Sequence, residues 1–190
     1  MAQFLKLLFQ LILNPAKGWE DVEDALIDRR LNVRAAYIRG FMPLIVCASL
    51  AAFVRMLYPG GPDFLSALSR AIIDFVALFL SYHLSIYVIS SMMPRFFDPA
   101  DADLARDQRR LALTSMMALA FVSLVVLVSN AIKVRIAILD FVPLYAIFII
   151  WKGCGFLGIS HRQEGLYMIV SSATILGSVY LLTIFFQSLV

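Results

Sequence analysis

Charged residues are scarce in this sequence. Of its 190 residues, 15% are charged and 62% are hydrophobic, and the mean hydropathy is +0.87. An average soluble domain is about 25% charged and about 45–50% apolar. The composition therefore excludes a soluble globular protein and predicts an integral membrane protein.

Cysteine and histidine are also rare, with two of each in the chain. Cys47 and Cys154 both fall within apolar segments, which excludes a disulfide framework. The sequence shows no HExxH, Ser-His-Asp, Cys-His or paired-carboxylate pattern at a convincing spacing. It also shows neither the alternation of a β-strand nor an internal repeat. We therefore expect an all-α protein that is not an enzyme.

Residues 1–34 are expected to form amphipathic helices on the cytoplasmic surface of the membrane. The first helix, residues 3–13, is too short to span a bilayer, which takes about 20 residues. It also lacks the basic start and the cleavage site of a signal peptide. Asn14 and Pro15 then suit the N-cap and the first position of a second helix.

An apolar stripe in the second helix predicts a membrane-surface anchor. Trp19, Val22 and Leu26 recur on one helical face. Tryptophan is enriched at the level of the lipid headgroups. We expect the stripe to rest on lipid, so that replacing Trp19 loosens this segment without unfolding the rest of the protein. The alternative is a helix that binds a partner protein.

Residues 35–190 are expected to form a polytopic membrane bundle of five transmembrane helices. The five apolar segments are each near or above the length needed to span a bilayer, and they cover about 40–58, 71–93, 111–132, 136–159 and 165–190. The stretch Phe141–Ser160 carries Pro143, Lys152 and three glycines. Lone ionisable groups and helix breakers in such segments usually face protein. We therefore expect the other spans to pack around this stretch.

The distribution of lysine and arginine predicts the orientation, because these residues concentrate on the cytoplasmic side of membrane proteins. One side of the predicted topology carries Lys6, Lys17, Arg29, Arg30, Arg34, Arg39, Arg95, Arg106, Arg109, Arg110, Lys152 and Arg162. The other side carries Arg55, Arg70, Lys133 and Arg135. The N-terminus is therefore predicted to be cytoplasmic and the C-terminus to lie outside.

Polar residues within the predicted spans suggest a pocket between the second and the fourth span. The residues that share a face in the second span are His83, Tyr87 and Ser90, and those in the fourth are Tyr145 and Lys152. If the two faces meet, they form a pocket with one fixed cation that suits an anionic group. Alternatively, Lys152 extends to the interface and His83 bonds to a tyrosine or to backbone across the bundle.

A second polar pair lies near the predicted outer interface. Arg70 and Asp74 are four residues apart, a spacing at which helical side chains can form an ion pair. Asp74 and His83 point to opposite faces of the same helix, so they are not expected to form a relay.

Two motif-like segments are interpreted as structural. Gly153–Gly158 matches G-x-G-x-x-G, but no strand precedes it, so we expect close helix packing or a loosened helix end and no nucleotide. Asp98–Asp103 is acidic like a calcium loop, yet it lacks the turn glycine and the terminal glutamate. We expect Asp98 to cap a helix. No metal and no cofactor is predicted.

The chain resembles the Yip1 family of five-span membrane proteins in its short bacterial form. The resemblance rests on Asn14-Pro15 followed by Trp19, on the five spans, and on the pattern from Tyr145 to Trp151-Lys152-Gly153. It implies five helices, a cytoplasmic N-terminus and a bacterial inner membrane. Eukaryotic relatives act in vesicle traffic with Rab-type GTPases, but this sequence lacks their DLYGP-type motif. The resemblance therefore implies a fold without an agreed activity.

Two functions remain open, besides a less favoured membrane enzyme that acts on lipid headgroups. The first is a non-enzymatic membrane protein that organises lipids or partner proteins. The alternative is a small transporter or permeation subunit for an anionic solute or lipid, motivated by Asp74, His83 and Lys152 within the spans. The expected partners are membrane lipids and other membrane proteins or further copies of this chain, with no nucleic acid.

Overall fold

The part of the chain that the structure describes forms a bundle of helices joined by short turns. The computed structural model describes residues 1–96, 104–132 and 137–189. No strand occurs in these residues, so the predicted all-α class is confirmed for them. The acidic segment Asp98–Asp103, predicted to cap a helix, lies outside the described residues.

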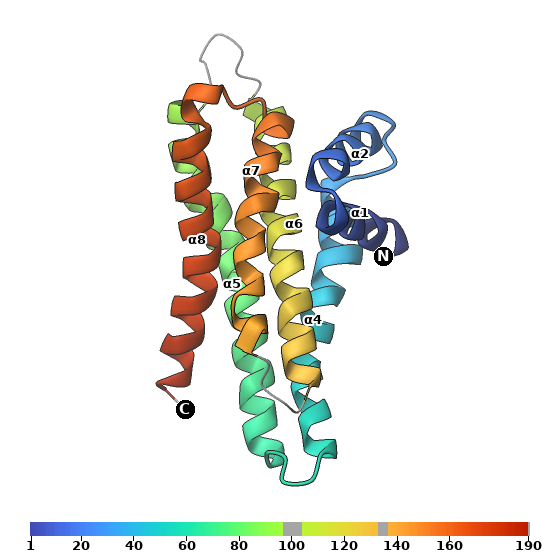
Figure 1. Ribbon diagram of the computed structural model, residues 1–190, viewed down its shortest axis with the longest axis vertical. Helices are drawn as coiled ribbons and strands as arrows, with labels where there is room; N and C mark the ends of the chain where they lie inside the picture. The colour runs from blue at the N-terminus through green and yellow to red at the C-terminus, as the bar shows by residue number, and fades with distance from the viewer. Residues whose placement is uncertain (97–103, 133–136, 190) are drawn as a thin grey trace.

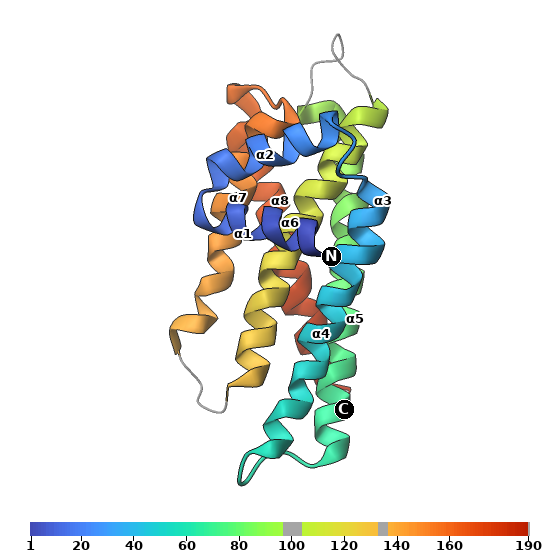
Figure 2. The ribbon, with the colours of Figure 1, turned by 90° about the vertical axis from the view of Figure 1, so that its right-hand side faces the viewer.

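The chain begins with two short helices and continues into a bundle of longer ones (Figures 1 and 2). In order, the elements are α1 (Ala2–Leu13), α2 (Pro15–Ile27), α3 (Val33–Ala36), the π-helical turn η1 (Tyr37–Phe41), α4 (Met42–Leu50), the 3-10 helix η2 (Ala51–Leu57), α5 (Phe64–Phe96), α6 (Leu104–Ala131), the 3-10 turns η3 (Ala137–Asp140) and η4 (Val142–Leu144), α7 (Tyr145–Leu157) and α8 (His161–Gln187).

Among the described residues, four helical stretches are long and apolar enough to cross a membrane, as an integral membrane protein requires. They are Val33–Leu57, Phe64–Met93, Arg106–Ala131 and His161–Gln187. They contain most of the predicted spans 40–58, 71–93, 111–132 and 165–190, and each begins earlier in the chain than predicted.

The remaining predicted span, 136–159, is shorter in the structure. Here α7 has 13 residues and is preceded by the 3-10 turns η3 and η4, with Pro143 in the second turn. The apolar helical stretch Val142–Leu157 is below the length of about 20 residues that a spanning helix needs. Helix length therefore does not confirm a fifth crossing.

The termini of the long helices define two ends of the bundle (Figures 1 and 2). The C-terminal ends of α5 and α7 and the N-terminal ends of α6 and α8 lie at the same end as α2, which we call the α2 end. The turn between η2 and α5 lies at the opposite end. Helices α1 and α2 lie across one side of the bundle, where α2 contacts α7 and α1 contacts α6.

Helix α6, rather than the stretch Phe141–Ser160, is the centre of the bundle. In its apolar window 72% of the residues are buried, compared with 22% in α8. It contacts α4, α5 and α7, and its Leu113, Met116 and Met117 side chains are fully buried. The expectation that the other spans surround Phe141–Ser160 is therefore wrong.

Pro43 accompanies a widened turn in the first span. Proline has no N–H to donate, and just before it the Met42 amide donates to the Tyr37 carbonyl, five residues back, as in a π-helix. Gly40 lies in this turn against α1, where a Cβ atom would come within 2.4 Å of the Phe4 ring. The turn brings Tyr37 to the side of the bundle that α5 occupies, as its ring contacts with Tyr82 show.

The ends of two helices follow from single residues. The Asn14 side chain accepts from the Lys17 amide at 3.3 Å, and Pro15 occupies the first position of α2, as predicted. Helix α7 ends at Gly158, whose φ of 75° lies in the left-handed region that glycine adopts without strain.

Candidate functional site

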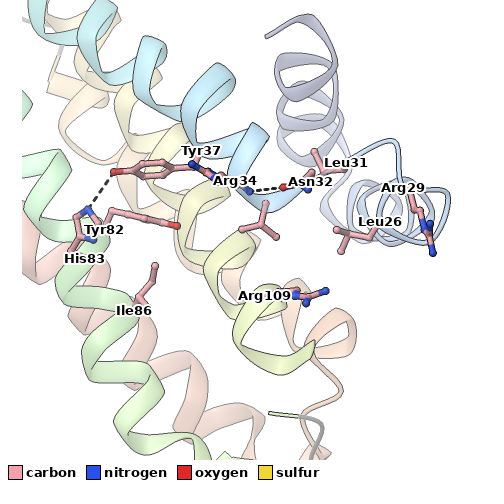
Figure 3. Close-up of a pocket in the computed structure, with 11 residues that line it drawn as sticks. Leu26, Arg29, Leu31, Asn32, Arg34, Tyr37, Tyr82, His83, Ile86 and Arg109 are labelled. Carbon is pink, nitrogen blue, oxygen red and sulfur yellow. Dashed lines mark hydrogen bonds between the residues drawn. The ribbon is translucent and has the colours of Figure 1, made fainter. Parts of the chain in front are cut away.

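A hollow with a cationic rim lies between the end of α2, α3, α5 and α6. Its volume is about 810 Å³, and Arg29, Arg34 and Arg109 line it together with Tyr37 and His83. We call it the arginine hollow. In Figure 3, Tyr37 and His83 lie on one side of the hollow, and Arg29 and Arg109 lie towards the other. Three stretches of the chain that are distant in the sequence, residues 26–37, residues 82–86 and Arg109, therefore supply one site.

The three arginines come from three different elements. Arg29 follows the end of α2, Arg34 lies in α3, and Arg109 lies in the second turn of α6. All three are exposed to solvent in the absence of a membrane. In the described part of the chain, none of the three is ion-paired with a carboxylate. By contrast, Arg30 pairs with Asp28.

The backbone at Arg29 is strained. Its φ is 55°, in the left-handed region that non-glycine residues rarely adopt. The turn is held by the Leu31 amide, which donates to the Ala25 carbonyl at 2.8 Å. Strain of this kind persists only where the surrounding structure enforces it, and it often marks a functional position.

The aromatic side of the hollow is built around Tyr37. Its hydroxyl and His83 Nε2 are 3.2 Å apart and form a hydrogen bond. Its ring stacks on Tyr82 with 5.1 Å between centroids, and Tyr82 is 6% exposed. This hydrogen bond matches the alternative in which His83 bonds to a tyrosine across the bundle.

Apolar side chains complete the walls of the hollow. They are Leu26, Leu31, Val33 and Ile86. The wall therefore combines guanidinium groups with hydrocarbon, which suits a ligand that is itself amphiphilic.

The pocket predicted between the second and the fourth span is not formed as expected. His83 lines the arginine hollow, which neither Tyr145 nor Lys152 lines. Tyr87 is 75% exposed on the outer surface of α5, and Ser90 is only partly buried. The faces of α5 and α7 do not meet there because α6 lies between them in the bundle and contacts both.

Tyr145 and Lys152 instead face the N-terminal helices. The Tyr145 hydroxyl donates to the Ile12 carbonyl at 2.9 Å. Lys152 lines a separate, smaller hollow beside Trp19 and Glu20, and its Nζ lies 4.4 Å from the centroid of the Trp151 ring.

The stripe predicted to rest on lipid is buried in protein. Trp19 is 3% exposed and Val22 is fully buried, and Leu26 lines the arginine hollow. Trp19 Nε1 donates to the Ile149 carbonyl of α7 at 2.9 Å, and the indole stacks on Phe156 at 5.0 Å. The prediction that Trp19 lies at the level of the lipid headgroups is therefore wrong, because the stripe packs on the apolar surface of α7.

An ion pair from α6 also stabilises the contact between α2 and α7. Arg110 of α6 donates to the Glu23 carboxylate and to the Phe156 carbonyl, and its guanidinium lies 5.0 Å from the Phe156 ring centroid. Gly153 leaves room for the indole, since a Cβ atom there would lie 3.2 Å from Trp19. Close packing therefore explains one glycine of the G-x-G-x-x-G match, and the end of α7 explains another.

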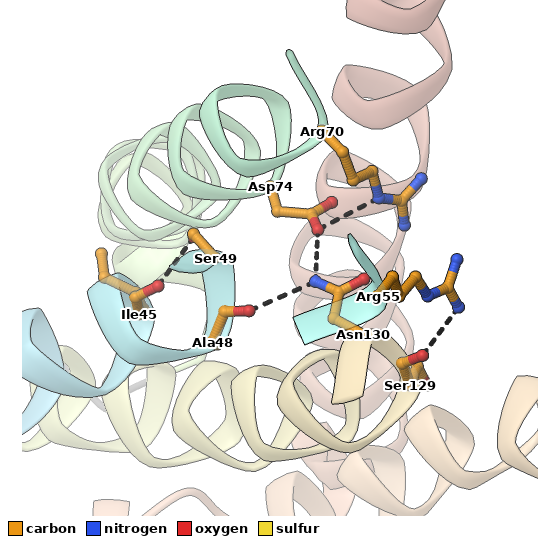
Figure 4. A network of polar contacts seen from close by, with 8 residues as sticks. All are labelled: Ile45, Ala48, Ser49, Arg55, Arg70, Asp74, Ser129 and Asn130. Atoms are coloured by element: carbon orange, nitrogen blue, oxygen red, sulfur yellow. Dashed lines mark hydrogen bonds and ion pairs between the residues drawn. The ribbon is translucent and has the colours of Figure 1, made fainter. Parts of the chain in front are cut away.

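A polar network joins α4, η2, α5 and α6 towards the end opposite α2 (Figure 4). Arg70 Nε donates to Asp74 Oδ2 at 3.1 Å, as their spacing predicts, and Asn130 Nδ2 donates to the same oxygen at 2.7 Å. Asn130 also donates to the Ala48 carbonyl at 3.2 Å, and the Arg55 guanidinium donates to the Ser129 carbonyl at 2.8 Å. The network ties α4 and η2 to α5 and α6.

The arginine hollow was missed by sequence reasoning, apart from His83. The sequence positions of the arginines indicate only the orientation of the chain, since nothing in their spacing places them at one hollow. Chemically, the hollow offers positive charge and an apolar wall. Within residues 1–96, 104–132 and 137–189, no group of three or more His, Cys, Asp and Glu side chains is placed to hold a metal ion.

Comparisons of the chain with protein-family models, with curated proteins and with solved structures find no match. The assignment of the candidate site therefore rests on the geometry of its residues.

Proposed function

We propose that this protein is a non-enzymatic integral membrane protein of the Yip1-like type that holds anionic lipid headgroups in the arginine hollow and so organises lipid around itself. The observation that carries the proposal is that Arg29, Arg34 and Arg109 line one hollow and that none of them has a described carboxylate partner. Arginine suits such a role because its planar guanidinium binds phosphate through two parallel hydrogen bonds.

The apolar wall favours a lipid over a soluble anion. Leu26, Leu31, Val33 and Ile86 line the same hollow as the arginines. A small hydrated anion gains nothing from hydrocarbon surface, whereas the glycerol and first acyl carbons of a lipid bury apolar area against it. The hollow also lies along helices that are apolar enough to cross a membrane.

The proposed orientation places the α2 end at the cytoplasmic leaflet of a bacterial inner membrane. The basis is the concentration of lysine and arginine near that end, including the rim of the hollow itself. In this arrangement α7 is a short fifth crossing, completed by η4, and α8 returns the chain to the outside.

Labelling of single cysteines tests this topology. Gln3→Cys and Ser188→Cys are introduced separately into a background in which Cys47 and Cys154 are serine. With an impermeant maleimide on intact cells, Ser188→Cys is expected to react and Gln3→Cys to react only after permeabilisation. Reaction of both positions from the same side contradicts the five-crossing arrangement.

Retention of lipid tests the proposed function. The variant Arg34→Gln/Arg109→Gln removes two rim charges that are exposed and that no described carboxylate pairs with, so folding is expected to be unaffected. A hydrogen bond to a charged group contributes about 1.5–3 kcal/mol, so retention of anionic lipid is expected to fall at least about tenfold. Native mass spectrometry of the detergent-purified protein measures it.

Arg30→Gln is the matched control for the retention experiment. Arg30 follows the same helix as Arg29, but it pairs with Asp28 and does not line the hollow. It is expected to retain lipid like the unmodified protein. Equal loss in Arg30→Gln and in the double variant would show a diffuse charge effect and overturn the assignment of the site.

A further inference from the structure

Among the described residues that line the arginine hollow, His83 is the one whose charge changes near neutral pH. Histidine ordinarily gains or loses its charge between about pH 5 and 8, whereas arginine stays positive and tyrosine stays neutral in that range. The other lining residues are arginines, tyrosines, Asn32 and hydrocarbon side chains. The His83 side chain is exposed, so a proton can reach it. The charge of the hollow therefore depends on pH through this histidine.

One ring nitrogen of His83 is engaged and the other is free (Figure 3). Nε2 lies 3.2 Å from the Tyr37 hydroxyl, and Nδ1 has no hydrogen-bond partner among the described residues. Neutral imidazole carries one N–H, so either member of this bond can donate. Imidazolium carries two, so Nε2 then donates to the Tyr37 oxygen, and both Nδ1–H and the tyrosine hydroxyl hydrogen are left free. Protonation therefore adds hydrogen-bond donors to the hollow as well as a charge.

Aromatic neighbours hold the His83 ring at the wall of the hollow. Its centroid lies 4.7 Å from that of Phe79 and 5.3 Å from that of Tyr82, both in edge-on contacts. Tyr37, the hydrogen-bond partner, in turn stacks on Tyr82. These packed rings keep the imidazole in one place, so that the charge it gains appears at a fixed position beside any ligand in the hollow.

The charged groups around this position are all positive. Arg34 lies in α3, Arg109 lies in α6 and Arg29 follows α2, and no carboxylate lines the hollow. The arginines repel a proton on His83, and no acid at the wall offsets that repulsion. A bound anion does offset it, so the binding of a proton and the binding of an anion favour each other. Anion binding in the hollow therefore strengthens as the pH falls.

We infer that His83 is a pH-controlled binding group of the arginine hollow, which as imidazolium adds a fourth positive charge and a free N–H for the anionic lipid headgroup. This inference rests on the proposed function and names what regulates the same site. The protein holds anionic lipid more tightly in acid and releases it as the pH rises.

Retention of phosphatidylglycerol at two pH values tests the inference. This lipid is a phosphodiester and lacks the second ionisation of a phosphomonoester, which has a pKa of about 6, so its own charge stays constant. Purified protein in detergent is offered dioleoyl phosphatidylglycerol at about pH 7.5 and at about pH 5.5, a range in which histidine titrates. Native mass spectrometry measures the bound fraction. About fivefold tighter binding is expected at the lower pH, since one exposed unit charge contributes roughly that factor.

The two histidines of the chain provide a matched pair of variants. His83→Gln stays neutral at both pH values, so its affinity is expected to change by less than about 1.5-fold. His161→Gln is the control, because His161 is exposed, pairs with Glu164 and does not line the hollow. It is expected to keep the full response to pH. An unchanged response in folded His83→Gln would overturn the inference, as would loss of the response in His161→Gln.

His83→Lys keeps the test decisive if His83→Gln folds poorly. Lysine is charged at both pH values. This variant is therefore expected to bind phosphatidylglycerol at the higher pH as tightly as the unmodified protein does at the lower pH, and to show no response to pH. A response that persists in His83→Lys would belong to another group and would overturn the inference.

The outcomes separate this inference from the proposed function. If the unmodified protein retains phosphatidylglycerol equally at both pH values and Arg34→Gln/Arg109→Gln loses it, the role of His83 is wrong and the proposed function stands. If the unmodified protein retains no phosphatidylglycerol at either pH, both are wrong.

Discussion

The Asp74→Ala variant is expected to melt about 10 °C below the unmodified protein in detergent. Asp74 is 4% exposed and accepts hydrogen bonds from Arg70 and Asn130 through the same oxygen. Removing one member of a buried ion pair costs about 3–5 kcal/mol because its partner is left uncompensated. The Arg70 side chain is 42% exposed and can turn towards water, so the lower end of that range, about 3 kcal/mol, applies here.

Two further variants define the origin of this effect. Asp28→Ala is the matched control, since it removes an acid whose ion pair with Arg30 is exposed at the surface, and it is expected to change the melting temperature by less than about 2 °C. Asn130→Ala removes the contact that joins α6 to both α5 and α4, and it is expected to destabilise about half as much as Asp74→Ala. Equal melting of Asp74→Ala and Asp28→Ala would show that the network does not stabilise the bundle.

This network also shows what the sequence can and cannot predict. The Arg70–Asp74 pair follows from helical periodicity, because residues four apart share a face. Asn130 is 56 residues away, and its approach to Asp74 depends on the register between α5 and α6, which no local pattern encodes. Asn130 was accordingly expected only as part of the end of an apolar span.

The positions and lengths of the helices were largely predictable, since an apolar run bounded by polar residues has few alternatives to a helix in a membrane protein. The exception is the stretch around α7. Its apolar composition continues through Pro143, whereas the structure starts the α-helix only at Tyr145. Hydropathy reports which residues avoid water and does not report where a helix begins.

The candidate site was predictable only at His83. The periodicity of α5 places His83 on a face, but the identity of its partner depends on the π-helical turn that orients Tyr37. The arginines of the hollow lie near the ends of three separate elements, and only the tertiary structure brings them to one hollow. Lys152 was predicted in a shared pocket from the helical face that it shares with Tyr145, whereas in the structure it lies beside Trp19 and Glu20 of α2.

The amphipathic stripe of α2 illustrates the same limit. An apolar stripe indicates that one face avoids water, and it does not distinguish lipid from protein because both are apolar. The two surroundings differ in the hydrogen-bond partner of the Trp19 indole N–H, which in the structure donates to the Ile149 carbonyl at 2.9 Å. At a membrane surface that group would bond to water or to headgroups.

Trp19→Ala is therefore expected to destabilise the folded protein rather than only loosen its N-terminal segment. Replacing a buried tryptophan with alanine costs about 3–5 kcal/mol, and here it also removes the stacking on Phe156 and the bond to α7. Because α2 carries Leu26 and is followed by Arg29 at the hollow, its release is expected to reduce anionic lipid retention as well. Melting in detergent and native mass spectrometry measure the two effects.

Trp151→Ala is the matched control, because Trp151 lies in α7 with 43% of its surface exposed. It is expected to melt close to the unmodified protein and to retain lipid normally. Trp19→Phe keeps an aromatic ring against Phe156 but loses the hydrogen bond to Ile149. Its free energy of unfolding is expected to lie between those of Trp19→Ala and Trp151→Ala, about 1–2 kcal/mol below that of the unmodified protein. If Trp19→Ala and Trp151→Ala melt alike while the N-terminal segment becomes sensitive to protease, α2 is a peripheral anchor and its packing on α7 does not hold the hollow together.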